Sequence, residues 1–475
     1  MIDKKFYLTI PIFYANSDLH MGHAYTTVLA DIVARYRRGV GERVHFLAGS
    51  DEHGDKIAKA AKAVGKDTQL FVDERAASFE ALFRLLNISN DDFIRTTDRT
   101  RHFPAVVAMW GKLVASGDIY KAEYESLYCV GCEETKTDKD LVDGKCPLHN
   151  LVPEQLKEEN YFFKLSRYTE KLKILIETDE LRIRPVTRKN EILSLIKEGL
   201  SDVSFSRPAE KVSWGIPVPG DASQVMYVWC DALTNYISAI GYPDENKMRE
   251  WWPADVQMLG KDILRFHAAI WPAMLMSAGL PIQKEILCHG FITSGGKKMS
   301  KTMGNVIDPR TLVSEYGVDA FRYFLAREIS PFDDGDITIE KFKDAYNANL
   351  ANGLGNLTSR IMKMATSYID TAIETGDTKH YRFAEYEQAM SEFRVNDAAN
   401  VAWAAISELD REIQETEPFK LYKTDPDKAR EIVRGLVVGL SKIVPMITPI
   451  MPETAAKIDA AIKEHQMPEA LFMRK

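Results

Sequence analysis

The stretch "YANSDLHMGHAYTTVLAD", Tyr14 to Asp31, decides how the chain begins to fold. The strand-like run "KKFYLTIPIF" precedes it, and a helical pattern follows in which five apolar residues share one face: Val28, Leu29, Ile32, Val33 and Tyr36. A strand therefore passes into a helix at His20, Gly22 and His23. Free backbone N–H groups and the helix dipole favour an anion at such a junction, although a helix start with two incidental histidines has the same pattern.

Strand-like and helix-like runs alternate from residue 1 to about residue 113. "ERVHFLAGSDEHG" reads as a second strand ending in a polar loop, and "DKIAKAAKAVG" and "TQLFVDERAASFEALFRLLN" read as helices. This alternation is typical of a parallel α/β sheet of the Rossmann type, whose ligands bind at the carboxyl ends of the strands. We expect a catalytic domain whose two halves span residues 1–113 and 209–295, with a connective insertion at 114–208 between them. We expect a linking segment at 296–345 and an all-α domain at 346–475.

The composition restricts where the protein works and what it binds. The chain has 475 residues, 45% of them hydrophobic and 27% charged, with a net charge of −8. No apolar run reaches membrane-spanning length, and the N-terminal residues lack the apolar region of a signal peptide. We expect a cytoplasmic protein without membrane contact, in which any nucleic acid is bound by local basic patches.

Three of the five cysteines lie close together in the sequence. Cys129 and Cys132 are separated by two residues, as are Cys146 and His149, and a loop of thirteen residues joins the two pairs. Two short chelating pairs of this kind predict one tetrahedral structural zinc site with no open coordination position. The alternative is reduced cysteines without a metal. Cys230 and Cys288 are expected to be buried small residues.

A second motif lies far along the chain, in "GGKKMSKTMGN", Gly295 to Asn305. Two glycines precede Lys297, Lys298 and Lys301, and a mobile lysine-bearing loop suits a polyphosphate whose charge grows as pyrophosphate leaves. A lysine run alone is usually a solvated face. The pair of motifs, HMGH near the start and KMSKT much later, indicates a nucleotide site.

These motifs resemble the HIGH and KMSKS signatures of the class I aminoacyl-tRNA synthetases. More closely, the chain resembles the methionyl-tRNA synthetase family along its whole length, through "PIFYANSDLHMGHAY", "GSDEHG", "YCVGCEE", "WGIPVPG", "YVWCDALTNY", "GKDILRFHAAIWPAML", "HGFITSGGKKMSKTMGN" and "NLTSR". The resemblance implies catalytic roles for His20, His23, Lys298 and Lys301. It implies an ATP site containing Gly22, Gly260, Asp262, His289, Gly290, Lys298, Met299, Ser300 and Lys301. Thr302 stands where many relatives have serine, and it keeps the hydroxyl.

A methionine site is implied in the same way. A thioether offers no strong hydrogen-bonding group, so its pocket must rely on shape, apolar area and sulfur–aromatic contact. The matching positions are Ile12, Tyr14, Trp229, Tyr236, Ile263 and His267 for the side chain, with Asp51 facing the substrate ammonium. Core packing is the alternative for each aromatic residue taken alone. Leu233 stands where some relatives have proline. The leucine, isoleucine and valine enzymes share both signatures but normally carry a much larger editing insertion.

The helical region resembles the family's anticodon-binding bundle. Asn356 and Arg360 are four residues apart and share a helix face, and they match positions that contact the CAU anticodon. Phe419 stands where many relatives have tryptophan. A solvated helix face is the alternative for Asn356 and Arg360. Because many relatives continue into a dimerising domain and this sequence stops at the bundle, we expect a monomer.

The resemblance implies a reaction in two steps. Methionine and ATP, with Mg²⁺, give methionyl-adenylate and pyrophosphate, and the amino acid then passes to the 3′-terminal adenosine of tRNA(Met). Two alternatives from other classes are an inactive paralogue that only binds RNA and a small-molecule nucleotidyltransferase with an HxGH motif. Intact HMGH, KMSKT and Asp51 disfavour the first, and the helical region with the cysteine insertion disfavours the second.

Overall fold

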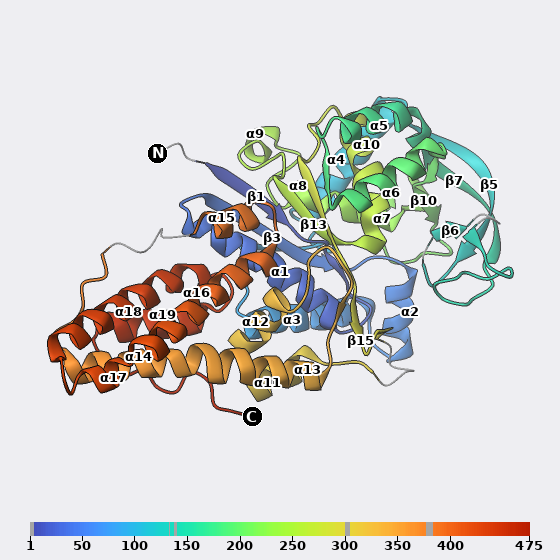
Figure 1. Cartoon of the computed structure of the whole chain (residues 1–475). Helices are drawn as coiled ribbons and strands as arrows, with labels where there is room; N and C mark the ends of the chain where they lie inside the picture. Colours follow the sequence, from blue (N-terminus) through green and yellow to red (C-terminus); the bar gives the residue numbers. More distant parts are fainter. Residues whose placement is uncertain (1–3, 133, 137–139, 300–304, 377–382) are drawn as a thin grey trace.

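The computed structural model describes residues 4–475 except 133, 137–139, 300–304 and 377–382. A parallel sheet lies at its centre, between the cysteine-bearing insertion and the helical C-terminal region (Figure 1). Within the described residues the strand order is β2-β3-β1-β13-β14-β8, with β4 pairing with β3, and every pair is parallel. The strands are β1 (Lys5–Thr9), β2 (Phe13–Tyr14), β3 (Arg43–Asp51), β4 (Asp92–Arg95), β8 (Arg182–Arg184), β13 (Val256–Gly260) and β14 (Glu285–His289).

Helices cover both faces of this sheet. The side chains of β1 alternate, so that Phe6 and Leu8 enter one apolar core with Val28, whereas Tyr7 enters a second core with Trp271. The covering helices include α1 (Met21–Gly39), α2 (Asp55–Ala63), α3 (Thr68–Leu85), α4 (His102–Ala115) and α10 (Trp271–Ser277). The expected Rossmann-type α/β fold is therefore confirmed, and α1 is the helix that the opening stretch predicted.

The described part of the expected insertion is mainly an antiparallel sheet with one 3-10 helix and two α-helices. Its sheet contains β5 (Ile119–Cys129), β6 (Glu134–Lys136), β7 (Glu154–Phe163) and β9 (Val203–Ser204), and its helices are η2 (Leu165–Tyr168), α5 (Thr169–Glu177) and α6 (Val186–Lys197). One strand in the same range, β8, pairs instead with β14 of the catalytic sheet. This part of the chain is therefore interwoven with the catalytic sheet.

The chain returns to the catalytic sheet through short elements. Before β13 they are β10 (Ser206–Pro208), β11 (Pro217–Val218), β12 (Asp221–Met226), α7 (Val228–Leu233), α8 (Asn235–Ser238) and α9 (Glu245–Met248). After β13 come η3 (Lys261–Ile263) and η4 (Phe266–Ile270). A small sheet then follows β14, formed by β15 (Ile292–Ser294), β16 (Lys297–Lys298) and β17 (Gly335–Asp336). The element η4 is a π-helix, a form that is rare and frequent at functional sites.

Helices make up most of the described chain after residue 308. They are α11 (Pro309–Tyr316), α12 (Val318–Arg327), α13 (Ile339–Ala345), η5 (Tyr346–Gly355), α14 (Asn356–Tyr368), α15 (Ala384–Ser391), α16 (Val395–Thr416), α17 (Pro418–Leu421), α18 (Pro426–Ile447) and α19 (Pro452–Lys463). The expected all-α C-terminal region is confirmed (Figure 1). The helices that the structure describes include none with the length and apolar character needed to span a bilayer.

A buried ion pair joins the helical region to the sheet. The guanidinium of Arg322 on α12 donates to Asp31 of α1 at 2.7 Å, and both side chains are inaccessible to solvent. Arg322 also donates to the carbonyl oxygens of Pro449 and Ile450, at 2.9 Å each. The residue that ends the opening stretch thus fixes α12 and the turn before α19 against α1.

Candidate active site

A cavity of about 410 Å³ opens at the carboxyl ends of the central strands. Its walls bring together predicted residues from the whole catalytic region: Ile12, Tyr14, His20, Gly22, His23, Asp51, Trp229, Tyr236, Gly260, Asp262, Ile263, His267, His289 and Gly290. Strands β1, β3, β13 and β14 are neighbours in the sheet, so polar residues that follow them meet at one edge. The cavity therefore contains every predicted methionine contact and most of the predicted ATP contacts.

The two histidines of the opening stretch cap helix α1. Nδ1 of His20 accepts the backbone N–H of Gly22 at 3.1 Å, and Nδ1 of His23 accepts the backbone N–H of His20 at 3.1 Å. The two rings stack with their centroids 3.8 Å apart. Because each Nδ1 accepts, the proton of each neutral ring lies on Nε2, which is left as a donor.

The surroundings keep these rings neutral. Removal from water lowers the pKa of His23 well below its ordinary value, and His20 adds to the effect. Removal from water also lowers the pKa of His20, with Asp262 acting against the shift and Lys298 reinforcing it. Both rings can therefore donate hydrogen bonds at neutral pH without carrying a charge.

Two glycines pack closely where the nucleotide contacts are expected. A Cβ on Gly260 would lie 2.8 Å from the Asp262 carboxylate, and one on Gly290 would lie 2.0 Å from the carbonyl oxygen of Asp333. His289 donates from Nδ1 to the Gly290 carbonyl at 2.8 Å, and its Nε2 lies 2.7 Å from the Thr26 hydroxyl. Gly290 is thus required by packing against the chain at Asp333 as well as by the cavity.

The lysine motif begins in a tight hairpin. Gly295 and Gly296 have φ angles of +62° and +71° and join β15 to β16, which a residue with a side chain would do only under strain. The carboxylate of Asp336 accepts the N–H of Gly296 at 2.7 Å. Lys298 ends β16 and is exposed.

The remaining residues of this motif are placed less directly. Met299 packs against the apolar core. The predicted Ser300 and Lys301 lie outside the described residues, as does Thr302.

Two polar side chains bond to each other where the methionine side chain is expected. The Tyr236 hydroxyl lies 2.6 Å from Nε2 of His267, whose Nδ1 lies 3.0 Å from the Ile263 carbonyl. Burial lowers the pKa of His267 to about 4. A neutral ring that donates from Nδ1 must accept at Nε2, so the phenol of Tyr236 donates to it. The two polar groups at this wall satisfy each other.

Sequence reasoning missed Phe266, whose ring stacks on Trp229 with centroids 3.7 Å apart. Phe266 and His267 begin the π-helix η4, and the 3.6-residue period of an ordinary helix gives no sign of this irregular turn. Thr26, Lys56 and Asn235 also line the cavity. The run "HAYTT" could have indicated Thr26, since it stands one helical turn after Gly22.

A buried carboxylate behind the cavity was also missed. Asp231 accepts from Nδ1 of His53 at 2.6 Å and from Nε2 of His102 at 2.7 Å. His102 also contacts the Ser238 hydroxyl, at 2.9 Å. Burial alone raises the pKa of the Asp231 carboxyl, but His53 and His102 outweigh it and lower the pKa to about 2. This network ties the "GSDEHG" loop to α4, α7 and α8.

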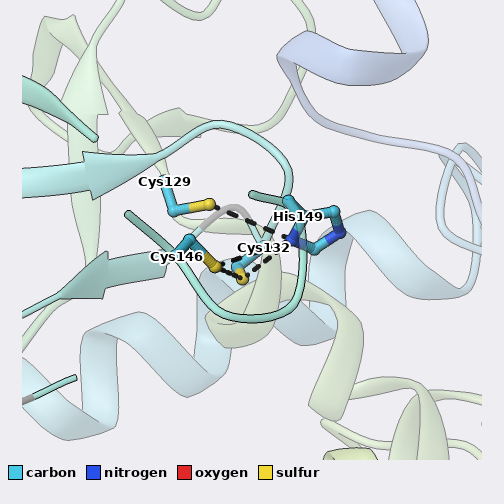
Figure 2. Close-up of side chains that lie close together, drawn as sticks. All are labelled: Cys129, Cys132, Cys146 and His149. Carbon is cyan, nitrogen blue, oxygen red and sulfur yellow. Dashed lines mark hydrogen bonds between the residues drawn. The ribbon is translucent and has the colours of Figure 1, made fainter. Parts of the chain in front are cut away.

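The predicted metal ligands come together at the tip of the insertion (Figure 2). The ligand atoms of Cys129, Cys132, Cys146 and His149 lie within 4.8 Å of one another. The Sγ atoms of Cys132 and Cys146 are 3.5 Å apart, and Nδ1 of His149 lies 3.3 Å from Sγ of Cys132 and 3.8 Å from Sγ of Cys146. A tetrahedral zinc site with bonds of about 2.0 to 2.3 Å has ligand–ligand edges of roughly 3.5 to 3.8 Å, so this group fits a metal ion.

The tip of the insertion reaches the cavity. Gly131 and Cys132 form part of the cavity wall. A Cβ on Gly131 would lie 2.5 Å from the His149 ring, so only glycine fits between the two cysteines of the first pair at this point. The metal-ligand cluster and the cavity therefore share a short segment of chain.

The predicted anticodon residues lie away from the cavity, in the helical region. Asn356 begins α14 and is exposed, and Arg360 follows on the same helix. Nη1 of Arg360 donates to Asp410 of α16 at 2.5 Å. Phe419 on the short helix α17 is 43% exposed. An exposed aromatic ring and a half-buried guanidinium are groups that can meet unstacked bases.

Comparison with known proteins identifies the class. Residues 6–151 and 132–362 match the family described as "tRNA synthetases class I (M)", and residues 366–471 match the anticodon binding domain of methionyl tRNA ligase. The fold, the HMGH cavity and these matches define a class I aminoacyl-tRNA synthetase.

Individual relatives make the assignment more specific. The methionine–tRNA ligase of Thermotoga maritima is 40% identical over 98% of this chain and 76% of its own length, and that of Rickettsia bellii is 41% identical over 96% and 92%. The structure of Mycobacterium tuberculosis methionyl-tRNA synthetase in complex with methionyl-adenylate matches with a TM-score of 0.90 and 35% identity, over 99% of this chain and 98% of that one. Its apo form gives a TM-score of 0.84 at 32% identity, over 99% of this chain and 98% of that one. The chain belongs to the methionyl-tRNA synthetase family.

Proposed function

We propose that the cavity joins methionine to ATP between its aromatic pocket and the two histidines at the start of α1. Family membership makes the chain a methionine–tRNA ligase, which activates methionine to methionyl-adenylate and then transfers it to tRNA(Met). One observation carries the residue assignments: the residues expected to hold methionine and most of those expected to hold the nucleotide line a single cavity.

Adenylate formation needs charge stabilisation and alignment, and no covalent enzyme intermediate. The methionine carboxylate attacks the α-phosphorus of ATP in line, and negative charge builds on the phosphate oxygens as pyrophosphate leaves. The Nε2–H groups of His20 and His23 are donors for this charge, and the neutral state of both rings avoids repelling Lys298. Lys298 and Lys301 are proposed to hold the departing pyrophosphate. Mg²⁺ is proposed to accompany ATP, held mainly by phosphate oxygens and water.

Selection of methionine is proposed to rest on saturated hydrogen bonding. The Tyr236 hydroxyl and the His267 ring satisfy each other, so a polar amino-acid side chain entering here would lose its water contacts and gain few partners. A thioether loses little, and the Trp229 and Tyr236 rings offer it sulfur–aromatic contact. Asp51, which also lines the cavity, is proposed to bind the substrate ammonium.

Zinc is the proposed occupant of the cysteine–histidine cluster. Three thiolates and one imidazole in tetrahedral reach suit Zn²⁺, which would hold the two short chelating pairs together. With four protein ligands the site is structural, and its position beside Gly131 and Cys132 means that it shapes one wall of the cavity.

The helical region is proposed to read the anticodon through Asn356, Arg360 and Phe419. Arg360 uses one of its five N–H donors on Asp410, which orients the guanidinium plane. We also propose the domain limits, the monomeric state and the cytoplasmic location that the sequence predicts. Sedimentation analysis measures the oligomeric state.

Two substitutions test the division of labour. In His23→Ala the exchange of pyrophosphate into ATP should fall by about 10²-fold or more, because the variant removes a donor used in the transition state. In Arg360→Ala that exchange should stay within about twofold, while kcat/KM for tRNA falls by about tenfold or more. Equal loss of pyrophosphate exchange in both variants would contradict the assignment.

A further inference from the structure

Lys56 is a cation of the cavity to which the adenylation step gives no role. It occupies the first turn of α2, just after the "GSDEHG" loop, and is half-buried. Its Nζ donates to the Gly131 carbonyl at 3.5 Å and lies 5.7 Å from the centroid of the Tyr14 ring. Lys56 therefore stands between the methionine pocket and the metal-bearing tip of the insertion.

Lys56 lines the cavity, and its described neighbours supply no counter-charge. Among the described side chains no carboxylate forms an ion pair with it, whereas Lys59 of the same helix pairs with Asp55 at 2.5 Å. A carbonyl oxygen and the face of a phenol ring attract an ammonium only weakly compared with an anion. A half-buried lysine in such surroundings is suited to an anionic ligand.

The strand order indicates which anion this is. Lys56 follows β3, whereas the nucleoside contacts follow β13 and β14, and β1 lies between β3 and β13. Neighbouring strands are about 4.8 Å apart, so the ends of β3 and β13 are separated by about 10 Å and those of β3 and β14 by about 14 Å. The proposed function already assigns the phosphates of ATP to His20, His23, Lys298 and Lys301.

The other substrates of the reaction narrow the choice of the anion that Lys56 binds. The methionine ammonium is a cation that Lys56 would repel, and the methionine carboxylate must point toward the α-phosphorus of ATP. The anion left over is the phosphodiester backbone at the 3′ end of the tRNA, whose terminal ribose hydroxyl must reach the adenylate.

We propose that Lys56 binds the phosphodiester next to the terminal adenosine of the tRNA during the transfer step, exchanging its Gly131 carbonyl contact for a phosphate oxygen. The assignment rests on the proposed function of the cavity. It makes Lys56, with Gly131 beside it, the place where the acceptor end is positioned, and it makes Lys56 a binding residue for tRNA.

Lys56→Met and Lys56→Arg test this proposal, with Lys59→Met as the matched control on the outer face of the same helix. In Lys56→Met, kcat/KM for tRNA should fall by about tenfold while pyrophosphate exchange falls by no more than about threefold. Loss of one phosphate contact should also reduce the slope of log(kcat/KM) against log[salt] by about 0.7 to 0.9. Lys56→Arg should keep the wild-type slope, and so should Lys59→Met.

The salt dependence of kcat/KM for tRNA distinguishes two roles for Lys56, binding of a tRNA phosphate and structural support of the insertion. A fall in tRNA charging with an unchanged slope would mean that Lys56 only props the tip of the insertion, and it would overturn the proposal. A fall in pyrophosphate exchange as large as the fall in charging would place Lys56 on ATP or methionine and would also overturn it. Absence of exchange in the unsubstituted enzyme is a different result, because it contradicts the proposed function itself.

Discussion

The imidazole rings of His20 and His23 stack 3.8 Å apart, and a backbone N–H occupies Nδ1 of each. The glutamine amide nitrogen can reach the position of Nε2, whereas the asparagine amide nitrogen falls near Nδ1, where an acceptor is needed. Because Nε2 is the atom left to donate, His23→Gln should keep at least about tenfold more exchange activity than His23→Asn. Steady-state pyrophosphate exchange on both variants measures the difference. The reverse order would mean that Nδ1 faces the reacting phosphates.

The pocket wall should respond to acid through His267. Its pKa is about 4 in the folded chain, below the ordinary value of about 6.5 in the unfolded chain. As the pH falls, the unfolded chain takes up this proton first, so stability is lost from about pH 6.5 downward and the loss levels off below about pH 4. This residue alone should lower the free energy of unfolding by about 2 kcal/mol between pH 7 and pH 5.

His267→Gln removes that contribution. The difference between the melting temperatures at pH 7 and pH 5 should therefore be smaller in this variant than in the unsubstituted protein. An unchanged difference would show that the ring is protonated or exposed in the folded state.

The Asp231 network should affect methionine binding through the residues it holds. Asp231→Asn keeps the shape of the side chain, but its amide nitrogen faces one of the two imidazoles as a second donor. Trp229 lies on the same short helix, and Asp51 lies two residues before His53, so the KM for methionine should rise by about tenfold while the KM for ATP changes little.

Asp118→Asn is the control for this prediction. Asp118 is a buried carboxylate that accepts from Tyr168 and Ser277 outside the cavity. Both variants should lower the melting temperature, and only Asp231→Asn should raise the KM for methionine. Similar KM values for methionine in the two variants would contradict the prediction and would mean that Asp231 contributes only to stability.

The Arg322–Asp31 pair should dominate the stability of the junction between sheet and helices. Arg322→Met leaves Asp31 buried with Arg35 as its one cation among the described side chains, and it leaves the Pro449 and Ile450 carbonyls without this donor. Removal of one partner of a buried pair costs about 3 to 5 kcal/mol. Arg411→Met, which removes an exposed pair with Glu415, should cost less than about 1 kcal/mol. Thermal melts of the two variants measure the contrast, and equal shifts would contradict it.

Metal content provides a direct test of the cysteine–histidine cluster. The purified chain should carry about one zinc per molecule, and Cys146→Ser should lose it, because three remaining ligands bind more weakly and leave a position open. Cys288→Ser is the matched control, since Cys288 is buried in the catalytic sheet. Full zinc content in Cys146→Ser would exclude this cluster as the metal site.

The sequence was sufficient for features that follow from strand ends. Asp51 and Gly260 each end a strand of the parallel sheet, and the carboxyl ends of parallel strands in one sheet meet at one edge. The metal cluster could be predicted because its ligands come in two short chelating pairs. The metal cluster follows from local spacing, whereas the strand-end residues follow from the alternation of strands and helices along the chain.

Features that depend on irregular backbone or on distant pairing could not be predicted. Phe266 reaches Trp229 through a π-helix, which leaves no periodic signal. Strand β8 has three residues, too few for an alternating pattern, and its place in the sheet is set by β14. Asp231, His53 and His102 come from three separate segments, so only the folded structure brings them together.

The most direct test of the central claim is the exchange of labelled pyrophosphate into ATP by the unsubstituted chain, with methionine, leucine, isoleucine and cysteine supplied in turn. The cavity described above predicts rapid exchange with methionine and exchange at least about 10²-fold slower with the other three amino acids. Absence of exchange with methionine, or equal exchange with leucine, would contradict the account.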